Sequence, residues 1–167
     1  LEMEVCSEHS ELAKKPDSWF LRRNGKRVHA QGRLFLNFAN PDVRGHVLNV
    51  IDRLVEMGVG YIKNDYNACI GNGDDTIGTS AADGLLTHMR CFYEFIDEVR
   101  ERYPELILEN CGSGGMRADY GVLSHFHLQS TSDQEFYHKN PSVIVGALAG
   151  ILPEQAGIWV YPSTAVQ

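Results

Sequence analysis

Long apolar runs, paired cysteines and an excess of positive charge are all missing from this 167-residue sequence. No apolar stretch approaches the roughly 20 residues that a membrane-spanning helix needs, and no signal peptide is evident, so we expect no membrane partner. The four cysteines lack C-x-x-C spacing, which favours reduced thiols in a cytoplasmic protein. A net charge of −7 argues against nucleic acid as the main partner.

The composition is that of an ordinary globular domain, with 43% hydrophobic and 22% charged residues. We therefore expect residues 1–167 to belong to a single domain with a real core. The sequence begins at Leu1 and enters strand-like sequence at once. We expect the chain to be part of a longer polypeptide or to associate with itself, because an incomplete sheet leaves strand edges unpaired.

Six strand-like segments alternate with helix-like segments. The strands are expected at residues 1–6, 33–38, 61–67, 106–111, 126–133 and 157–162. The helices are expected to begin after Asn40, near residue 82, at residue 117 and after Asn140. This alternation, without a strong hairpin signal, indicates a parallel sheet with crossover helices.

Polar residues gather at the carboxyl ends of these strands, which is where a (β/α)₈ barrel carries its active site. Such barrels need about 250 residues, so six strands predict an incomplete TIM barrel, about strands 2–7. A doubly wound open sheet is the alternative. The long polar loop at 68–82 is expected to be a working loop, and the basic stretch 22–27 a turn around Asn24-Gly25.

The segment Tyr61–Asn67 places a cation, a carboxylate and an amide at alternate positions: Lys63, Asp65 and Asn67. Alternate residues of a strand share a face, so the three side chains would point into one space. The competing interpretation is an exposed strand end on which Lys63 and Asp65 neutralise each other. A second carboxylate, Asp133, ends another predicted strand, and a pair of carboxylates is what glycoside hydrolysis requires.

Several motifs together resemble glycoside hydrolase family 36, the bacterial and fungal-type α-galactosidases. They are Tyr61-Ile62-Lys63-x-Asp65-x-Asn67, then Glu109-x-Cys111-x-Ser113-Gly114-Gly115-x-Arg117-x-Asp119, then Thr131-Ser132-Asp133. The opening Glu2-x-Glu4 and Gly32-Arg33 resemble the entry to the second and third strands of that family's barrel. The resemblance covers nearly the whole chain in the right order.

The resemblance implies a retaining hydrolase that cleaves terminal α-galactosides by double displacement, with no cofactor and no metal. It implies Asp65 as the nucleophile and Asp133 as the general acid/base. Lys63, Asn67 and Arg33 would bind sugar hydroxyls of a galactoside or oligosaccharide. Cys111 and Gly114 would line the wall of the sugar-binding pocket.

Three residues depart from the family pattern. Asn64 and Ser130 stand where tryptophan is usual, and Asn37 where aspartate is usual. The exact sugar therefore stays open, including α-N-acetylgalactosaminidase or galactosyl-transfer activity. A catalytically silent carbohydrate-binding or assembly fragment is the alternative from another class.

Other patterns carry weaker predictions. His125-x-His127 could hold a metal, although we favour histidines that pack inside the fold. The glycine-rich turn 111–115 could cradle a phosphate, as in a barrel isomerase or aldolase, but it lacks the P-loop lysine. Lys63 as a Schiff-base nucleophile is disfavoured by Asp65 beside it. Phe92, Tyr93 and Phe95 are expected to form helix core.

Overall fold

The computed structural model describes residues 1–71 and 73–159, and these residues form two compact units. One unit contains Leu1, residues 61–67 and the chain from Leu106 onward. We call it the parallel unit. The other contains residues 2–60 and 68–105, and we call it the antiparallel unit. None of the helices in the described ranges is long and apolar enough to cross a membrane.

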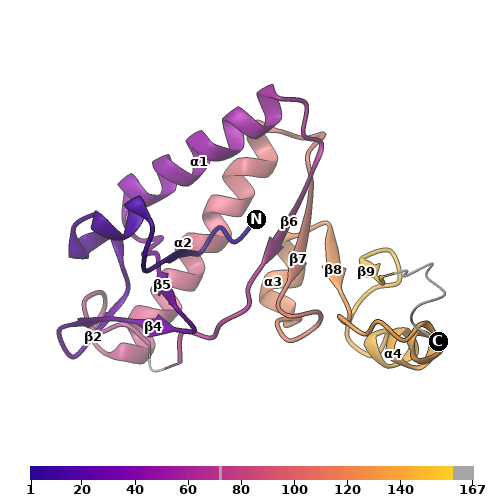
Figure 1. Cartoon of the computed structure of the whole chain (residues 1–167). Coiled ribbons are helices and arrows are strands. Elements are labelled where there is room, and N and C mark those ends of the chain that lie inside the picture. The colour runs from indigo at the N-terminus through magenta and orange to yellow at the C-terminus, as the bar shows by residue number, and fades with distance from the viewer. Residues whose placement is uncertain (72, 160–167) are drawn as a thin grey trace. The chain divides into compact units, whose positions relative to one another are not determined.

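The parallel unit is built on a four-stranded sheet in which every neighbouring pair runs parallel (Figure 1). In order, its strands are β6 (Tyr61–Asp65), β7 (Ile107–Cys111), β8 (Leu128–Ser130) and β9 (Ala156–Gly157). Helices connect β7 to β8 and β8 to β9: α3 (Tyr120–His125) and, after the short η3 (Tyr137–Lys139), α4 (Asn140–Ala147). The prediction of an α/β chain with a parallel sheet is therefore confirmed. Residues 160–162 of the last expected strand lie outside the described residues.

The antiparallel unit departs from the sequence prediction. Its sheet has the order β1 (Val5–Ser7), β5 (Arg33–Phe35), β4 (His29–Ala30), and both pairings are antiparallel. The first two predicted strands therefore pair with each other in opposite directions rather than joining one six-stranded parallel sheet. A two-residue turn at Gln31-Gly32, whose φ angles of 52° and 73° suit a tight hairpin, reverses the chain between β4 and β5.

A second hairpin joins β2 (Arg22–Arg23) to β3 (Lys26–Arg27) through Asn24-Gly25, with φ angles of 51° and 74°. The turn at Asn24-Gly25 was predicted correctly. The interpretation that the sequence carries no strong hairpin signal was wrong. The hairpin meets the polar loop at Asp75, which accepts a hydrogen bond from the Asn24 N–H (2.7 Å) and lies 3.9 Å from the Arg23 guanidinium. This bond helps to fasten the polar loop after residue 67 to the hairpin.

Asp74 is the main anchor of that loop and is completely buried. Its carboxylate accepts backbone N–H groups of Arg22 (2.6 Å), Thr76 (2.8 Å) and Ile77 (3.0 Å). A buried carboxylate is stable only when such donors surround it. The described part of the loop is thus held by its own aspartate.

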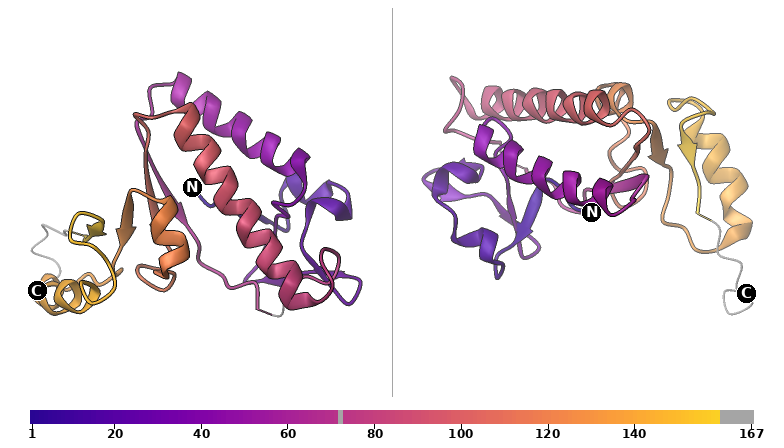
Figure 2. Two further views of the ribbon diagram at one scale, coloured as in Figure 1. Left: turned by 180° about the vertical axis from the view of Figure 1, so that it is seen from behind. Right: turned by 90° about the horizontal axis from the view of Figure 1, so that it is seen from above.

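Two long helices, α1 (Pro41–Glu56) and α2 (Ala81–Arg102), lie side by side in all the views of this unit (Figures 1 and 2). Asn40 caps α1 by accepting the Asp42 N–H, as its sequence predicts. The Phe38 ring lies 5.0 Å from Phe92 and 5.2 Å from Phe95, measured between centroids. Phe92 and Phe95 are fully buried, which confirms the prediction of helix core for these two, whereas Tyr93 is only partly buried. The short 3₁₀ helices η1 (Glu11–Lys14) and η2 (Asp17–Trp19) complete the unit.

Candidate active site

Strand β6 alternates between a buried and a partly exposed face. Ile62 and Asn64 are 4% and 1% exposed, whereas Lys63 and Asp65 are intermediate. The prediction that Lys63 and Asp65 share a face is therefore confirmed. The strand ends at Asp65, so Asn67 follows it, and Asn67 Oδ1 accepts a hydrogen bond from the Ser113 hydroxyl (2.9 Å).

Strand β7 extends this polar face. Lys63 pairs with Glu109 and Asp65 with Cys111 in the parallel register, so these side chains project on the same side of the sheet. The Asn110–Gln129 pairing makes Ser130 of β8 the next residue in the Asp65–Cys111 row. Three neighbouring strands thus contribute to one row at their carboxyl ends.

Asp65 ends β6 with one carboxylate oxygen in an unusual state. Its Oδ1 atom is buried and has no hydrogen-bond partner among residues 1–71 and 73–159. A buried acceptor without a partner is costly in a structural position. A donor on a ligand that reached this atom would remove that cost.

Lys63 contacts an aromatic ring rather than a carboxylate. Its Nζ lies 3.7 Å from the centre of the Trp159 ring, a cation–π contact. Within the described ranges no carboxylate lies close enough to Lys63 to form an ion pair, which disfavours mutual neutralisation with Asp65. Lys63 lines a hollow of about 290 Å³, whose wall also includes Tyr61, Glu109, Gly157, Ile158 and Trp159. Asp65 does not line it.

Cys111 is fully buried between polar neighbours. Its Sγ accepts the Gly114 N–H (3.3 Å), and it faces the Ser130 hydroxyl and the Asp65 carboxylate. Burial raises the pKa of the Cys111 thiol, the Gly114 N–H lowers it, and the Asp65 carboxylate raises it further. The thiol is therefore neutral at ordinary pH and available as a hydrogen-bond donor.

Gly114 brings the turn after β7 against the chain after β8. A Cβ at residue 114 would lie 2.6 Å from Ser132 Cα and 2.7 Å from the Asp133 nitrogen. Its φ of +80° is also a conformation that favours glycine. The close contact between the two segments thus requires glycine at position 114. This contact fixes the position of the Asp133 backbone.

Asp133 is exposed and lies three residues beyond the end of β8. Both β6 and β8 pair parallel with β7, so Asp65 and Asp133 stand at the same edge of one sheet with a single strand between them. The structure therefore places the two aspartates in one unit and at carboxyl ends of parallel strands. Their predicted chemical roles stay predictions.

Arg33, the remaining predicted sugar-binding residue, belongs to the antiparallel unit. Its guanidinium donates two hydrogen bonds to the Glu2 carboxylate, from Nε (2.8 Å) and Nη2 (2.9 Å). Nη1 donates to the Gln31 carbonyl (3.3 Å). Arg33 is thus held in a fixed orientation by its own unit.

The departures from the family pattern have identifiable places. Asn64 lies on the buried face of β6, opposite Lys63 and Asp65, so its substitution alters packing behind the polar face rather than a platform upon it. Ser130 lies on the polar face and donates its hydroxyl proton to Glu109. Asn37 is buried in the antiparallel unit, where its Oδ1 accepts the Ala39 N–H.

Sequence reasoning did not single out Tyr61, Glu109 or Trp159 for the site. Glu109 accepts hydrogen bonds from the Tyr61 and Ser130 hydroxyls. Burial raises the pKa of Tyr61, and the hydrogen bond to the Glu109 carboxylate and its charge raise it further. The alternation of Glu109 with Cys111 could have identified Glu109, whereas no local pattern brings Trp159 to Lys63.

The histidine pair has a structural use in part. His127 Nδ1 accepts the Leu108 N–H (3.1 Å), which fixes the chain between α3 and β8. Within the described part of the chain, no group of three or more histidine, cysteine, aspartate or glutamate side chains is arranged to hold a metal.

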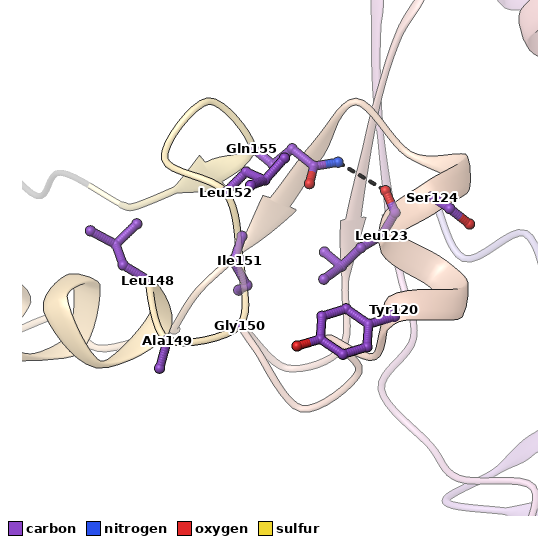
Figure 3. A pocket seen from close by; sticks show the side chains of 9 residues that line it. All are labelled: Tyr120, Leu123, Ser124, Leu148, Ala149, Gly150, Ile151, Leu152 and Gln155. Carbon is purple, nitrogen blue, oxygen red and sulfur yellow. Dashed lines mark hydrogen bonds between the residues drawn. The ribbon is translucent and has the colours of Figure 1, made fainter.

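A second hollow, of about 590 Å³, lies between α3 and the loop that follows α4 (Figure 3). Its lining is mainly apolar and includes Tyr120, Leu123 and Leu152. The Gln155 side chain crosses to donate to the Leu123 carbonyl (2.8 Å). None of the predicted site residues lines this hollow.

Comparison with known proteins relates the whole arrangement to one family. The chain is 33% identical over 125 residues to the bifunctional α-galactosidase/sucrose kinase AgaSK of Mediterraneibacter gnavus, covering 74% of this chain and 13% of that protein. The crystal structure of GH36 α-galactosidase AgaB from Geobacillus stearothermophilus matches with a TM-score of 0.83 and 25% identity, covering 96% of this chain and 23% of that one.

A variant of α-galactosidase AgaA from the same organism, in complex with 1-deoxygalactonojirimycin, matches with a TM-score of 0.82 and 25% identity over 96% of this chain and 23% of that one. The chain thus spans only a small part of the proteins it matches. The family model described as Melibiase matches residues 1–138, which include segments of both compact units. This chain belongs to the Melibiase family.

Proposed function

We propose that this chain is part of the catalytic domain of a retaining glycoside hydrolase that cleaves terminal α-galactosides. Family membership and the α-galactosidase names of its relatives support the reaction class. The complex of a similar protein with 1-deoxygalactonojirimycin supports a sugar-like ligand. The buried, unpartnered Oδ1 of Asp65 is the observation that carries the assignment of a reacting atom.

In this proposal residues 1–167 belong to one incomplete (β/α)₈ barrel domain. The parallel order β6-β7-β8-β9 with intervening helices is what a segment of such a barrel contains. The site residues Asp65 and Cys111 end their strands, as expected for the carboxyl-terminal mouth of a barrel.

The first chemical step uses both aspartates. A carboxylate oxygen of Asp65 attacks the anomeric carbon while the glycosidic bond breaks, and Asp133 gives its proton to the departing oxygen. A glycosyl ester on Asp65 results. Asp133 then takes a proton from water, whose oxygen attacks the anomeric carbon and releases Asp65. The anomeric configuration is retained because two inversions occur.

The remaining residues hold the sugar. Lys63, Asn67 and Arg33 hydrogen-bond sugar hydroxyls, and the Glu2 contacts of Arg33 would orient its guanidinium for that purpose. Cys111 and Gly114 form the wall beside Asp65. No cofactor takes part in these steps.

The apolar surface of α4 supports a covering partner. Val145 is 69% exposed, and no residue of α4 is buried. We propose that another part of the same polypeptide, or a second copy of the chain, covers this surface of α4. Sedimentation of the chain comprising residues 1–167 alone, compared with the full-length protein, tests this: a monodisperse monomer that unfolds cooperatively would contradict it.

The decisive experiment uses the full-length protein and 4-nitrophenyl α-galactoside. Asp65→Ala is expected to lower kcat by on the order of 10⁴-fold, because no nucleophile remains. Added azide should restore turnover by attacking in place of the carboxylate, giving a galactosyl azide of inverted configuration. Asp97→Asn, which changes a half-buried aspartate of α2 that pairs with Arg100, is the control and should retain wild-type turnover.

The leaving group separates the two aspartates. Asp133→Ala should lower kcat roughly 10²- to 10⁴-fold for an α-galactosyl sugar, whose leaving oxygen needs a proton. It should lower the first step far less for 4-nitrophenyl galactoside. Equal losses for both substrates would remove Asp133 from the acid role, and undiminished turnover in Asp65→Ala would remove Asp65 as nucleophile.

The alternatives are outcomes of the same measurements. Binding of 1-deoxygalactonojirimycin without turnover of any aryl glycoside would indicate a silent carbohydrate-binding protein. A higher kcat/KM for the 2-acetamido substrate would indicate α-N-acetylgalactosaminidase activity. Galactosylated acceptors among the products would indicate transfer.

A further inference from the structure

Glu109 precedes the row of Asp65, Cys111 and Ser130 along the strand direction, and it has no part in the reaction described above. It is two residues before Cys111 on β7 and shares its face. One carboxylate oxygen accepts the Tyr61 hydroxyl and the other accepts the Ser130 hydroxyl. Charge-assisted hydrogen bonds of this kind fix both partners strongly.

The bond from Ser130 determines where its only proton lies. A serine hydroxyl has one proton to donate and two lone pairs. Because the proton goes to the Glu109 carboxylate, Ser130 has only lone pairs left for other neighbours, and Cys111 is the next residue in its row. Ser130 is 1% exposed, so water does not compete for this orientation.

The next member of the chain is the Cys111 thiol. Gly114 N–H donates to its sulfur (3.3 Å), and the sulfur has one proton of its own. Of the two acceptors that it faces, the Asp65 carboxylate is stronger than the Ser130 hydroxyl. The thiol proton is therefore directed to Asp65.

We propose that Glu109 is a positioning residue for Asp65 and acts through Ser130 and Cys111. Its carboxylate keeps the Ser130 proton away from the sulfur, and the thiol is then free to hold one oxygen of Asp65. Oδ1 of Asp65 is buried and has no hydrogen-bond partner among the described residues, and it is the oxygen to which the attack is assigned. This inference rests on the proposed function of Asp65 as nucleophile.

Replacing Glu109 by glutamine should disturb this order of hydrogen bonds, while a side chain of nearly the same size still fills the position. The glutamine amide can donate to Ser130 Oγ, which lets the Ser130 proton turn toward Cys111. Asp65 then loses a fixed donor and becomes less well oriented. The loss of one such hydrogen bond corresponds to about a tenfold fall in rate.

The experiment measures kcat, KM and the Kd of 1-deoxygalactonojirimycin for the full-length protein, Glu109→Gln, Ser130→Ala and the double variant. We expect kcat to fall about tenfold in each single variant, with KM and Kd within twofold of wild type. The double variant should lose no more than the larger single loss, because both changes break one chain. Glu105→Gln makes the same chemical change at an exposed position and should match wild type.

Each other outcome is decisive. Wild-type kcat in Glu109→Gln, additive losses in the double variant, or equal weakening of kcat, KM and Kd would overturn the positioning role. Ser130→Thr keeps the hydroxyl, and its kcat should exceed that of Ser130→Ala if the proton to Glu109 matters. Full activity in Asp65→Ala would instead sink the proposed function, so the two failures are distinguishable.

Discussion

The two compact units bury different kinds of side chain. The antiparallel unit packs phenylalanine rings, with Phe38, Phe92 and Phe95 in contact and completely buried. The parallel unit buries amides and hydroxyls within its sheet, where Asn110 donates to Gln129 Oε1 (2.7 Å). Packed phenylalanine rings stabilise the fold but carry no acidic, basic or nucleophilic group. Polar groups in a sheet need matched partners, because a buried polar group without one is costly.

This difference predicts that substitutions in the antiparallel unit change stability most and those in the parallel unit change turnover. Three further variants, with effects of decreasing size, test that division beyond the aspartate and Glu109 experiments.

Phe92→Ala should have the largest effect on stability. The ring is fully buried against Phe38, so its removal leaves a cavity and should lower the free energy of unfolding by about 3–5 kcal/mol. Chemical denaturation followed by circular dichroism measures it. Phe136→Ala, at a side chain that is 44% exposed in the parallel unit, is the control. Similar losses in the two variants would remove the contrast between the units.

Gly114→Ala should have an intermediate effect. The added Cβ meets Ser132 and Asp133 backbone atoms at a φ of +80°, which should cost about 1–3 kcal/mol. The shift of Asp133 should also lower kcat. Gly146→Ala, where a Cβ meets nothing within 4 Å in α4, should be neutral or slightly stabilising. If both alanines behave alike, close packing at Gly114 does not set the position of Asp133.

The smallest expected effect is a loss of folding stability at acidic pH. Burial lowers the pKa of His46, with Lys15 and Arg53 adding to the shift. The unfolded chain then binds this proton more readily than the folded one, so folding stability should fall as pH drops through the unfolded pKa near 6.5. The penalty should be complete below the lower, folded pKa. His46→Gln should flatten this part of the stability curve, and an unchanged slope would contradict the shift.

The sequence predicted local features well where neighbouring residues decide them. The Asn40 cap and the shared face of Lys63 and Asp65 follow from spacing alone. Asn140 shows the limit of this reasoning: it was expected to cap α4, but it is itself helical, because η3 runs directly into the helix. A preceding turn can thus override a cap signal.

What the sequence alone determined is the main helices, the strands of the parallel sheet, the Asn24-Gly25 turn and the two aspartates at strand ends, since periodicity and backbone sterics act over a few residues. Only the tertiary structure decided that the first two strands pair antiparallel, that Trp159 covers Lys63 and that Ser130 gives its proton to Glu109. These facts depend on which distant segments meet, and that choice depends on burial and hydrogen bonding of the whole chain rather than on any local pattern.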